Sequence, residues 1–169
     1  MKRLSLPVVA VLVLTACATS PLGRQQLLFM PAAEMDQMGA TADNEMKEQR
    51  PTVSGTAQSR YVECVARAIV AVVDSDQQWE VTVFKDDSAN AFALPGGKIG
   101  VNTGLLDVAN NQDQLAAVIG HEVGHVLAQH SNERMSIQYA TQTGTQLVAA
   151  LAGGDSAEKQ TLLRLLGVG

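Results

Sequence analysis

The sequence has too few basic residues to suggest a nucleic-acid-binding protein. Its 169 residues include 12 lysines and arginines against 17 aspartates and glutamates, which gives a formal net charge of −5 at pH 7. Proteins that bind a phosphate backbone usually carry a basic excess, so this class is excluded. Hydrophobic residues make up 46% of the chain, which is enough for the core of one compact domain and excludes a disordered chain.

A hydrophobic run long enough to cross a membrane is also missing from the N-terminal region. The apolar stretch from Leu4 to Leu14 is shorter than the roughly 20 residues that a membrane-spanning helix needs. It follows a short basic start and leads into small residues, an order typical of a bacterial secretory signal. We therefore interpret residues 1–16 as a signal peptide rather than as a permanent membrane anchor.

The end of this segment, LTAC at residues 14–17, resembles a bacterial lipoprotein box. The resemblance implies cleavage before Cys17, acylation of Cys17 and a lipid-anchored protein that faces the periplasm. Ala18 stands where an aspartate would favour retention at the inner membrane, so we expect the outer membrane. A simple secreted protein is the alternative. Removal of the signal peptide would change the formal charge from −5 to −7, because the segment carries two basic residues.

Only two cysteines are present, which limits disulfide chemistry. If Cys17 carries lipid, Cys64 has no partner within the chain, and no internal disulfide forms even in an oxidising compartment. Cys64 lies among apolar residues in YVECVARAIVAVV, so we expect it to be a small buried core residue. A redox function through a reactive Cys64 is the alternative, which thiol labelling of the folded protein would test.

Hydrophobic periodicity predicts helices before and after one small sheet. Residues 31–50 favour one or two surface helices, and residues 57–73 favour a helix packed on a core. The residues expected on the buried face of this second helix are Tyr61, Val65, Ala68, Ile69 and Val72. Alternation over residues 78–86 predicts a strand. Residues 89–106 then predict two strands joined by a tight Pro-Gly-Gly turn, followed by a short helix.

The C-terminal half is expected to be helical. A helix with Asn111 as its N-cap is predicted to run to about His130, since Gln114 stands at the capping-box position. Residues 132–152 continue the helical pattern until Gly153-Gly154, and a last helix is expected from Asp155. No internal repeat or low-complexity segment is apparent in the sequence.

Histidine is scarce, and all three histidines lie within ten residues of one another. His121, Glu122 and His125 form the pattern H-E-x-x-H. On a helix, residues four apart lie about 40° apart around the axis and about 6 Å along it, so both imidazoles can bind one metal ion. Zinc lowers the pKa of bound water to about 7, and Glu122 can accept the proton and pass it to a leaving amine. The pattern therefore predicts peptide-bond hydrolysis.

The residues around the motif carry no charge, so an unligated histidine pair would be costly in a nearly dry helix. Gly120 and Gly124, with Ala117, predict a smooth face that lets another backbone approach closely. The alternative is that both histidines are hydrogen-bonded core residues and Glu122 is an ion-pair partner. On a continuous helix His130 is turned about 140° from His125, so we expect it to lie beside the site or at the surface and not to bind the metal.

Two segments together resemble a known family: NAFALPGGKIGVNTGLL at residues 90–106 and DQLAAVIGHEVGHVLAQHSNERMS at residues 113–136. They are similar to the zinc metallopeptidases that include HtpX, LoiP, BepA and the CAAX prenyl proteases, and most similar to the periplasmic lipoprotein branch. The resemblance covers about residues 57–152. It implies an α+β, zincin-like (gluzincin) domain that is mostly helical, with a small sheet and an active-site helix.

The resemblance also assigns roles to individual residues. His121 and His125 match the Zn²⁺ ligands, and Glu122 matches the general base. Asn90, Ala91 and Phe92 match an edge-strand segment that would bind extended peptide by strand addition. For Phe92, an ordinary core aromatic is the alternative.

The family's third ligand, a glutamate in an E-x-x-A-D segment on a later helix, has no match here. After His125 the only acidic residues are Glu133, Asp155 and Glu158. Glu133 would lie about 12 Å further along a continuous helix, and the other two fit a helix start, although a folded-back Glu158 stays an alternative. We therefore expect a C-terminally truncated peptidase that binds zinc weakly.

These observations divide the chain into a signal peptide (1–16), a linker and helical segment (17–56) and a peptidase domain (57–169). We predict a zinc-dependent metalloendopeptidase of the bacterial envelope that cleaves misfolded or envelope proteins. Its expected partners are polypeptide substrates, the membrane through lipid on Cys17, and outer-membrane assembly proteins, with no nucleic acid. The alternative is a catalytically inactive, truncated lipoprotein that acts as a chaperone or assembly scaffold.

Overall fold

The computed structural model describes residues 17–21 and 23–151. These residues form two units. The larger contains the described residues of Thr19–Gln25 and Met30–Ser131. The smaller contains Cys17 and Ala18, Gln26–Phe29, and the described chain from Asn132 onward. The expected signal peptide, the Gly153-Gly154 stop and the last helix lie outside the described residues. Among residues 17–21 and 23–151, the helices are all too short or too polar to cross a membrane.

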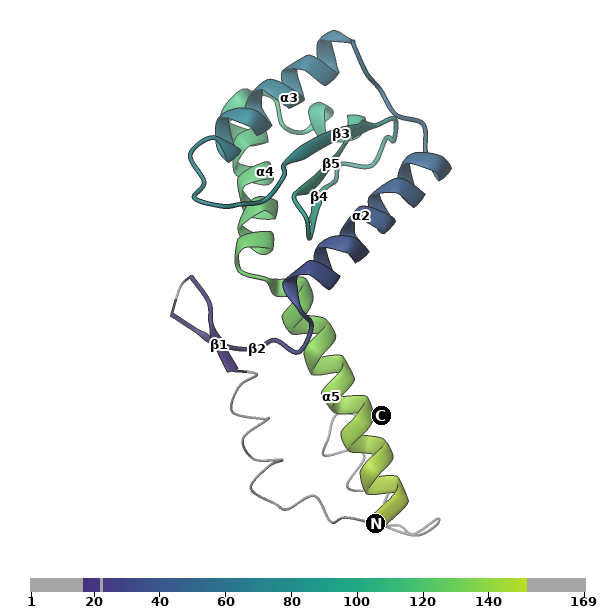
Figure 1. Cartoon of the computed structure of the whole chain (residues 1–169). Helices are drawn as coiled ribbons and strands as arrows, with labels where there is room; N and C mark the ends of the chain where they lie inside the picture. The colour runs from purple at the N-terminus through teal and green to yellow at the C-terminus, as the bar shows by residue number, and fades with distance from the viewer. Residues whose placement is uncertain (1–16, 22, 152–169) are drawn as a thin grey trace. The chain divides into compact units, whose positions relative to one another are not determined.

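The larger unit is built around a three-stranded sheet of β3 (Glu80–Phe84), β4 (Ala91–Leu94) and β5 (Lys98–Asn102) (Figure 1). The strand order is β3-β5-β4, so β4 is an edge strand of this sheet. β5 runs parallel to β3 and antiparallel to β4. The predicted strand, turn, strand and short helix are thus present, with the short helix as η1 (Thr103–Asp107).

Glycine makes the turn between β4 and β5. Gly96 and Gly97 have φ angles of 78° and 75°, in the left-handed region that other residues rarely adopt. Leu94 and Lys98 pair directly, so the connection is a three-residue loop, a common length for a β-hairpin. The turn therefore fixes the register in which Ala91 lies opposite Val101.

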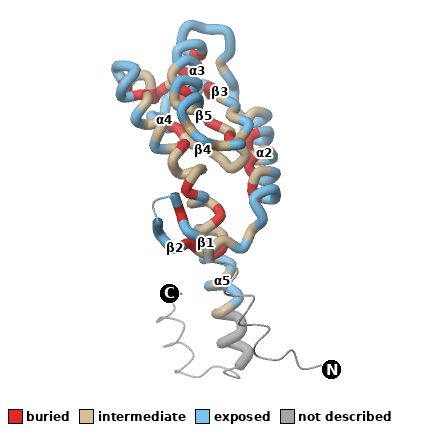
Figure 2. Tube along the Cα trace, turned by 60° about the vertical axis from the view of Figure 1, so that its left-hand side comes forward, coloured by how far each residue is buried: buried red, intermediate tan, exposed pale blue. Residues whose placement is uncertain are grey.

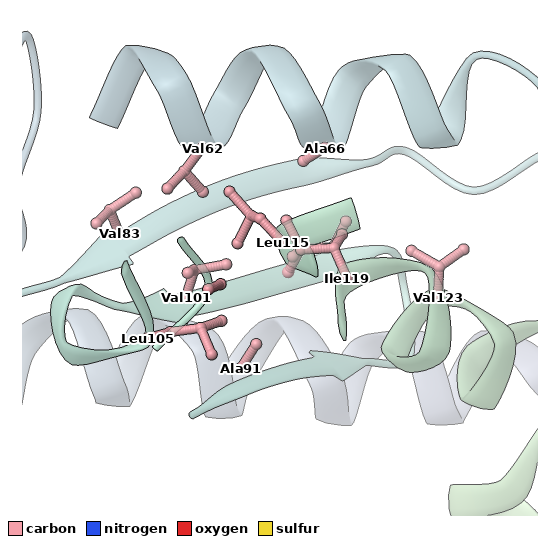
Figure 3. Close-up of a cluster of buried hydrophobic side chains, with 11 residues drawn as sticks. Val62, Ala66, Val83, Ala91, Val101, Leu105, Leu115, Ile119 and Val123 are labelled. Atoms are coloured by element: carbon pink, nitrogen blue, oxygen red, sulfur yellow. The ribbon is translucent and has the colours of Figure 1, made fainter. Parts of the chain in front are cut away.

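Two helices complete the core of the larger unit, α3 (Ala57–Val70) and α4 (Gln112–Leu127). Figure 3 shows their buried side chains meeting those of the strands. The core cluster consists of Val62, Ala66, Val83, Ala91, Ile99, Val101, Leu105, Ala109, Leu115, Ile119 and Val123. Three of these residues come from α4, so the helix that carries the histidines is anchored directly in the core.

The α3 helix begins as predicted, but its buried face is only partly the expected one. A capping box between Thr56 and Ser59 fixes its start. The fully buried positions are Ser59, Val62 and Ala66. Of the expected residues, Val65 and Ile69 are partly buried and pack against the core. Tyr61 and Ala68 are exposed, and Val72, beyond the end of the helix, is 85% exposed. The prediction was wrong for Tyr61, Ala68 and Val72, because apolar residues lie on more than one side of this helix and leave two candidate faces.

The expectation that Cys64 is buried is also wrong. This residue follows Val62 by two positions, about 200° around the helix, so it lies on the solvent side and is exposed. Cys64 is therefore not the buried core residue that its apolar neighbours suggested.

Residues 31–50 form one helix, α2 (Ala32–Gln49), which packs on the hairpin of β4 and β5. Gly39 is buried where the helix meets the turn, and a Cβ atom there would lie 2.0 Å from the carbonyl oxygen of Pro95. This glycine therefore allows a close contact between two backbones.

Ion pairs hold the other end of α2 to the sheet. Lys47 lies 2.6 Å from Asp43 and 2.5 Å from Glu80, and Lys98 lies 2.9 Å from Glu80. Hydrogen bonds from Lys47 and Lys98 lower the pKa of Glu80 from 4.5 to about 2. Arg50, just after α2, lies over the ring of Phe84, with 4.5 Å between the guanidinium carbon and the ring centroid.

The smaller unit joins a short strand segment to α5 (His130–Leu151), whose first two residues belong to the larger unit. β1 (Cys17–Thr19) and β2 (Gln25–Leu27) pair as a two-stranded sheet. The Phe29 amide donates to Ser136 Oγ over 2.7 Å, and Ser136 is fully buried. Figure 2 shows buried residues on both β2 and the first turns of α5.

The molecule as described is mostly helical with two small sheets.

Candidate metal centre

The α4 helix positions the H-E-x-x-H residues. The Asn111 side chain accepts a hydrogen bond of 3.0 Å from the Gln114 amide, which confirms the predicted N-cap. Leu115, Ile119 and Val123 repeat every four residues and are buried in the core. Because the motif histidines each follow one of these core residues by two positions, they lie on the opposite side of the helix. The core thus presents the motif to solvent.

The structure brings His121, Glu122 and His125 together. Nε2 of His121 lies 3.0 Å from Nε2 of His125, and the two ring centroids are 4.4 Å apart. One ligand atom from each of the three residues lies within 4.8 Å of the others. His121 is exposed and the other two are half-buried, so the expectation of a nearly dry histidine pair is wrong for His121.

This arrangement fits a tetrahedral metal ion. Zinc binds imidazole nitrogens at about 2.0–2.1 Å, which at a tetrahedral angle places two nitrogens about 3.3 Å apart. The separation of 3.0 Å between the two Nε2 atoms needs only a small widening to admit the ion. Glu122, next to His121 on the helix, has its carboxylate in the same cluster, where it can meet a water molecule rather than the ion.

The end of α4 differs from the prediction. The helix ends at Leu127 instead of continuing to His130, and Gln129 adopts a left-handed φ of 51°. The Ala128 and Gln129 amides still donate to carbonyls of α4, those of Gly124 and Val126. The next helix, α5, begins at His130.

This break places His130 against His125. The two Nδ1 atoms are 2.5 Å apart, and the ring centroids are 4.7 Å apart. The expected 140° separation was wrong, because it assumed a continuous helix. Sequence reasoning missed this contact, since neither glycine nor proline marks the break at residues 128–131. His130 does lie beside the site, which was one of the two positions expected for it, the other being the surface.

The expected close approach at the motif glycines is also absent. A Cβ atom at Gly120 or at Gly124 would meet no described atom within 4 Å. Within the part of the chain that the structure describes, these two glycines therefore border open space, and the prediction of a tightly packed neighbouring backbone was wrong there.

The expected substrate strand is β4. Ala91 and Phe92 are its first two residues, and Asn90 immediately precedes it. The Phe92 ring covers Gly100 on β5 and lies 5.9 Å from the Phe84 ring, so its side chain packs on the sheet. Ala91 is buried in the core. Any contact of this segment with a peptide would therefore come from the backbone of β4.

The third metal ligand is not among the groups gathered at this site. Within residues 17–21 and 23–151, the cluster consists of His121, Glu122 and His125. Asp155 and Glu158 lie outside the described residues, as does the side chain of Cys17. The distance expected for Glu133 no longer applies, because the helix that it assumed is broken at Gln129.

Comparison with known proteins places this site in a family. Residues 56–166 match the model described as Peptidase family M48. The mitochondrial metalloendopeptidase OMA1 of Schizosaccharomyces pombe is 43% identical over 91 residues, which cover 53% of this chain and 27% of that protein. The putative beta-barrel assembly-enhancing protease of Vibrio cholerae is 30% identical over 110 residues, which cover 64% of this chain and 22% of that protein.

A third relative, the beta-barrel assembly-enhancing protease of Escherichia coli, is 26% identical over 103 residues, which cover 60% of this chain and 21% of that protein. The matched region thus spans about a fifth to a quarter of the length of these curated relatives. The family model itself covers well over half of the chain and includes both the sheet and the histidine helix. The chain therefore belongs to peptidase family M48.

Proposed function

We propose that this protein is a zinc-dependent metalloendopeptidase of the gluzincin type. The observation that carries the proposal is the pair of Nε2 atoms of His121 and His125, 3.0 Å apart on a core-anchored helix with Glu122 beside them. Membership of family M48, together with relatives named metalloendopeptidases, supports the same activity. Two imidazole donors also suit zinc better than magnesium or calcium.

His121 and His125 hold the metal, and Glu122 moves the proton. When bound, zinc supplies Lewis-acid activation of water and of the scissile carbonyl. The water oxygen forms a bond to the carbonyl carbon while a Glu122 carboxylate oxygen accepts the water proton. Glu122 then passes that proton to the amide nitrogen as the C–N bond breaks, which releases a free amine and a carboxylic acid.

Substrate would bind along the free edge of β4. The Asn102 amide donates to the Asn90 carbonyl, so Asn90, Phe92 and Leu94 face β5 in the antiparallel ladder. The peptide groups of Ala91 and Ala93 therefore point to the other edge, where no described strand pairs with them. An extended peptide there would gain backbone hydrogen bonds and depend little on its side chains, which suits misfolded or envelope proteins as substrates.

The gluzincin assignment requires one further carboxylate ligand. Glu158 is the candidate in this sequence, and its position lies outside the described residues. Zinc titration of Glu158→Gln tests it: a large loss of affinity supports Glu158 as a ligand, and unchanged affinity rules it out.

We further propose that the protein works in the bacterial envelope. The signal-like residues 1–16 and the LTAC segment support lipidation at Cys17 and attachment to a membrane facing the periplasm, with the outer membrane favoured by Ala18. Two of the relatives are named beta-barrel assembly-enhancing proteases, which supports outer-membrane assembly proteins as partners. Mass spectrometry of the N-terminal peptide from expressed full chain would show acylated Cys17 or refute it.

Casein cleavage by the zinc-loaded full chain tests the activity. Wild type should bind one zinc ion per chain and cleave casein, and Glu122→Gln should keep the zinc but lose cleavage. His121→Ala should lose both. Glu45→Gln, on the exposed side of α2, is the matched control and should behave as wild type.

A scaffold function is the second candidate, because the described cluster offers only two imidazoles and the carboxylate assigned as base. Metal-free protein that suppresses aggregation of an unfolded client, with no cleavage by any zinc-loaded sample, would favour the scaffold and overturn the peptidase proposal. Loss of this suppression on Ala93→Pro, which removes an outward amide from β4 without removing a hydrogen bond to β5, would assign the scaffold activity to the same edge.

A further inference from the structure

We infer that His130 is a positioning residue that holds His125 in the orientation and tautomer needed to bind the metal. The inference rests on the proposed metal site and goes beyond it, because His130 was not expected to contact either ligand. It is carried by the contact between the Nδ1 atoms of His125 and His130, 2.5 Å apart.

The two nitrogens of His125 face different partners. Nε2 faces His121 Nε2 at 3.0 Å, on the side where the metal would bind, and Nδ1 faces His130. Two imidazole nitrogens at hydrogen-bond distance need one proton between them. A metal-binding Nε2 must offer a lone pair, so in neutral His125 the proton is on Nδ1 and is donated to Nδ1 of His130.

This assignment determines which ring nitrogen carries the proton in each of the three histidines, His121, His125 and His130. His130 accepts at Nδ1 and carries its own proton on Nε2. In the metal-free molecule His121 then donates from Nε2 to the lone pair of His125 Nε2. The opposite order would put a proton on His125 Nε2 and block the metal. A hydrogen bond to the far nitrogen of a metal-binding histidine also fixes the ring orientation and makes the ligand more basic.

The local backbone is arranged for this contact. On a continuous helix His130 would be turned about 140° from His125. Instead α4 stops at Leu127, and the left-handed φ of 51° at Gln129 redirects the chain so that the ring of His130 returns to His125. A non-glycine residue in this conformation persists when its surroundings hold it there.

Zinc titration of the full chain by competition with a chelator tests the inference. His130→Leu removes the acceptor but keeps much of the bulk, and we expect it to weaken zinc binding about 10-fold to 100-fold. His130→Asn places an amide oxygen close to the position of Nδ1 and should restore most of the affinity. Asn111→Ala, which removes the cap of the same helix, should lower the melting temperature and leave zinc affinity unchanged.

Nitrogen-15 NMR of the histidine rings in metal-free protein gives a second readout. Wild type should show His125 protonated on Nδ1, and His130→Leu should show a mixture of tautomers. Unchanged zinc affinity and an unchanged His125 tautomer in His130→Leu would overturn the inference. X-ray absorption that counts three imidazoles on the bound zinc would also overturn it, because His130 would then be a ligand.

These outcomes are separate from those of the proposed function. The NMR result on metal-free protein supports or refutes the positioning contact even if casein is never cleaved. Conversely, a peptidase that is active and keeps its zinc affinity in His130→Leu refutes only the inference.

Discussion

Replacing Gly39 with alanine tests how closely α2 docks on the hairpin that carries β4. In a solvent-exposed helix this change stabilises a protein by about 1 kcal/mol, because alanine has the higher helix propensity. Here the new Cβ atom would lie 2.0 Å from the Pro95 carbonyl oxygen and 2.9 Å from its carbonyl carbon. Both are backbone atoms, which cannot move away by rotating a side chain.

The two effects act in opposite directions, and the clash is the larger. Overpacking in a tight contact costs about 1–3 kcal/mol, and a backbone neighbour favours the upper end. After the helix-propensity gain of about 1 kcal/mol, Gly39→Ala should lower the free energy of unfolding by about 2 kcal/mol. Urea unfolding followed by circular dichroism measures this change.

Gly120→Ala supplies the matched control within another helix. Its Cβ atom would meet no described atom within 4 Å, so only the propensity term remains, and the variant should be more stable by about 1 kcal/mol. Opposite signs for the two substitutions are therefore expected. Equal stabilisation by both would refute the close contact of Gly39 with Pro95, and with it the docking of α2 on the hairpin.

Substitutions at three other positions test the core, a cap and the ion pairs. Ile119→Ala empties a fully buried position and should cost about 3 kcal/mol in urea unfolding, and a loss below 1 kcal/mol would contradict the core. Thr56→Ala should cost about 1 kcal/mol and Thr56→Ser almost nothing; equal losses would argue against the capping box. Because folding lowers the pKa of Glu80 from 4.5 to about 2, its contribution is present above pH 4.5 and disappears as pH falls towards 2. Glu80→Gln should therefore flatten thermal stability across that range, and a profile identical to wild type would refute the ion pairs.

Sequence alone could predict the elements that have a local signal. Asn111 followed by Gln114 predicted the start of α4, and the Pro95-Gly96-Gly97 turn predicted the hairpin of β4 and β5. Each signal depends on a few residues that are neighbours in the sequence, so it can be recognised without knowing the tertiary structure. The proximity of His121 and His125 follows in the same way from helical geometry alone.

The buried face of α3 could be predicted only in part, because its sequence is apolar on several sides. Val62 and Ala66 are buried against the core, whereas Cys64 and Ala68 are exposed. Which face is buried depends on where α4 and the sheet pack against α3. The sequence of α3 alone does not determine that position. A substitution such as Cys64→Ser should consequently be tolerated, in contrast to what its apolar neighbours suggest.

The break between α4 and α5 was not predicted, and for that reason the contact between His125 and His130 was missed. Helix propensity continues through Ala128, Gln129 and His130, so extrapolation of α4 was reasonable on propensity grounds. A left-handed non-glycine residue costs about 1–2 kcal/mol, and the surrounding structure must supply that energy. The hydrogen bond between His125 and His130 is a contribution that exists only when the chain turns at Gln129. Gln129→Gly should therefore stabilise the fold while leaving zinc affinity unchanged, because glycine adopts the same φ without strain and the two rings still meet.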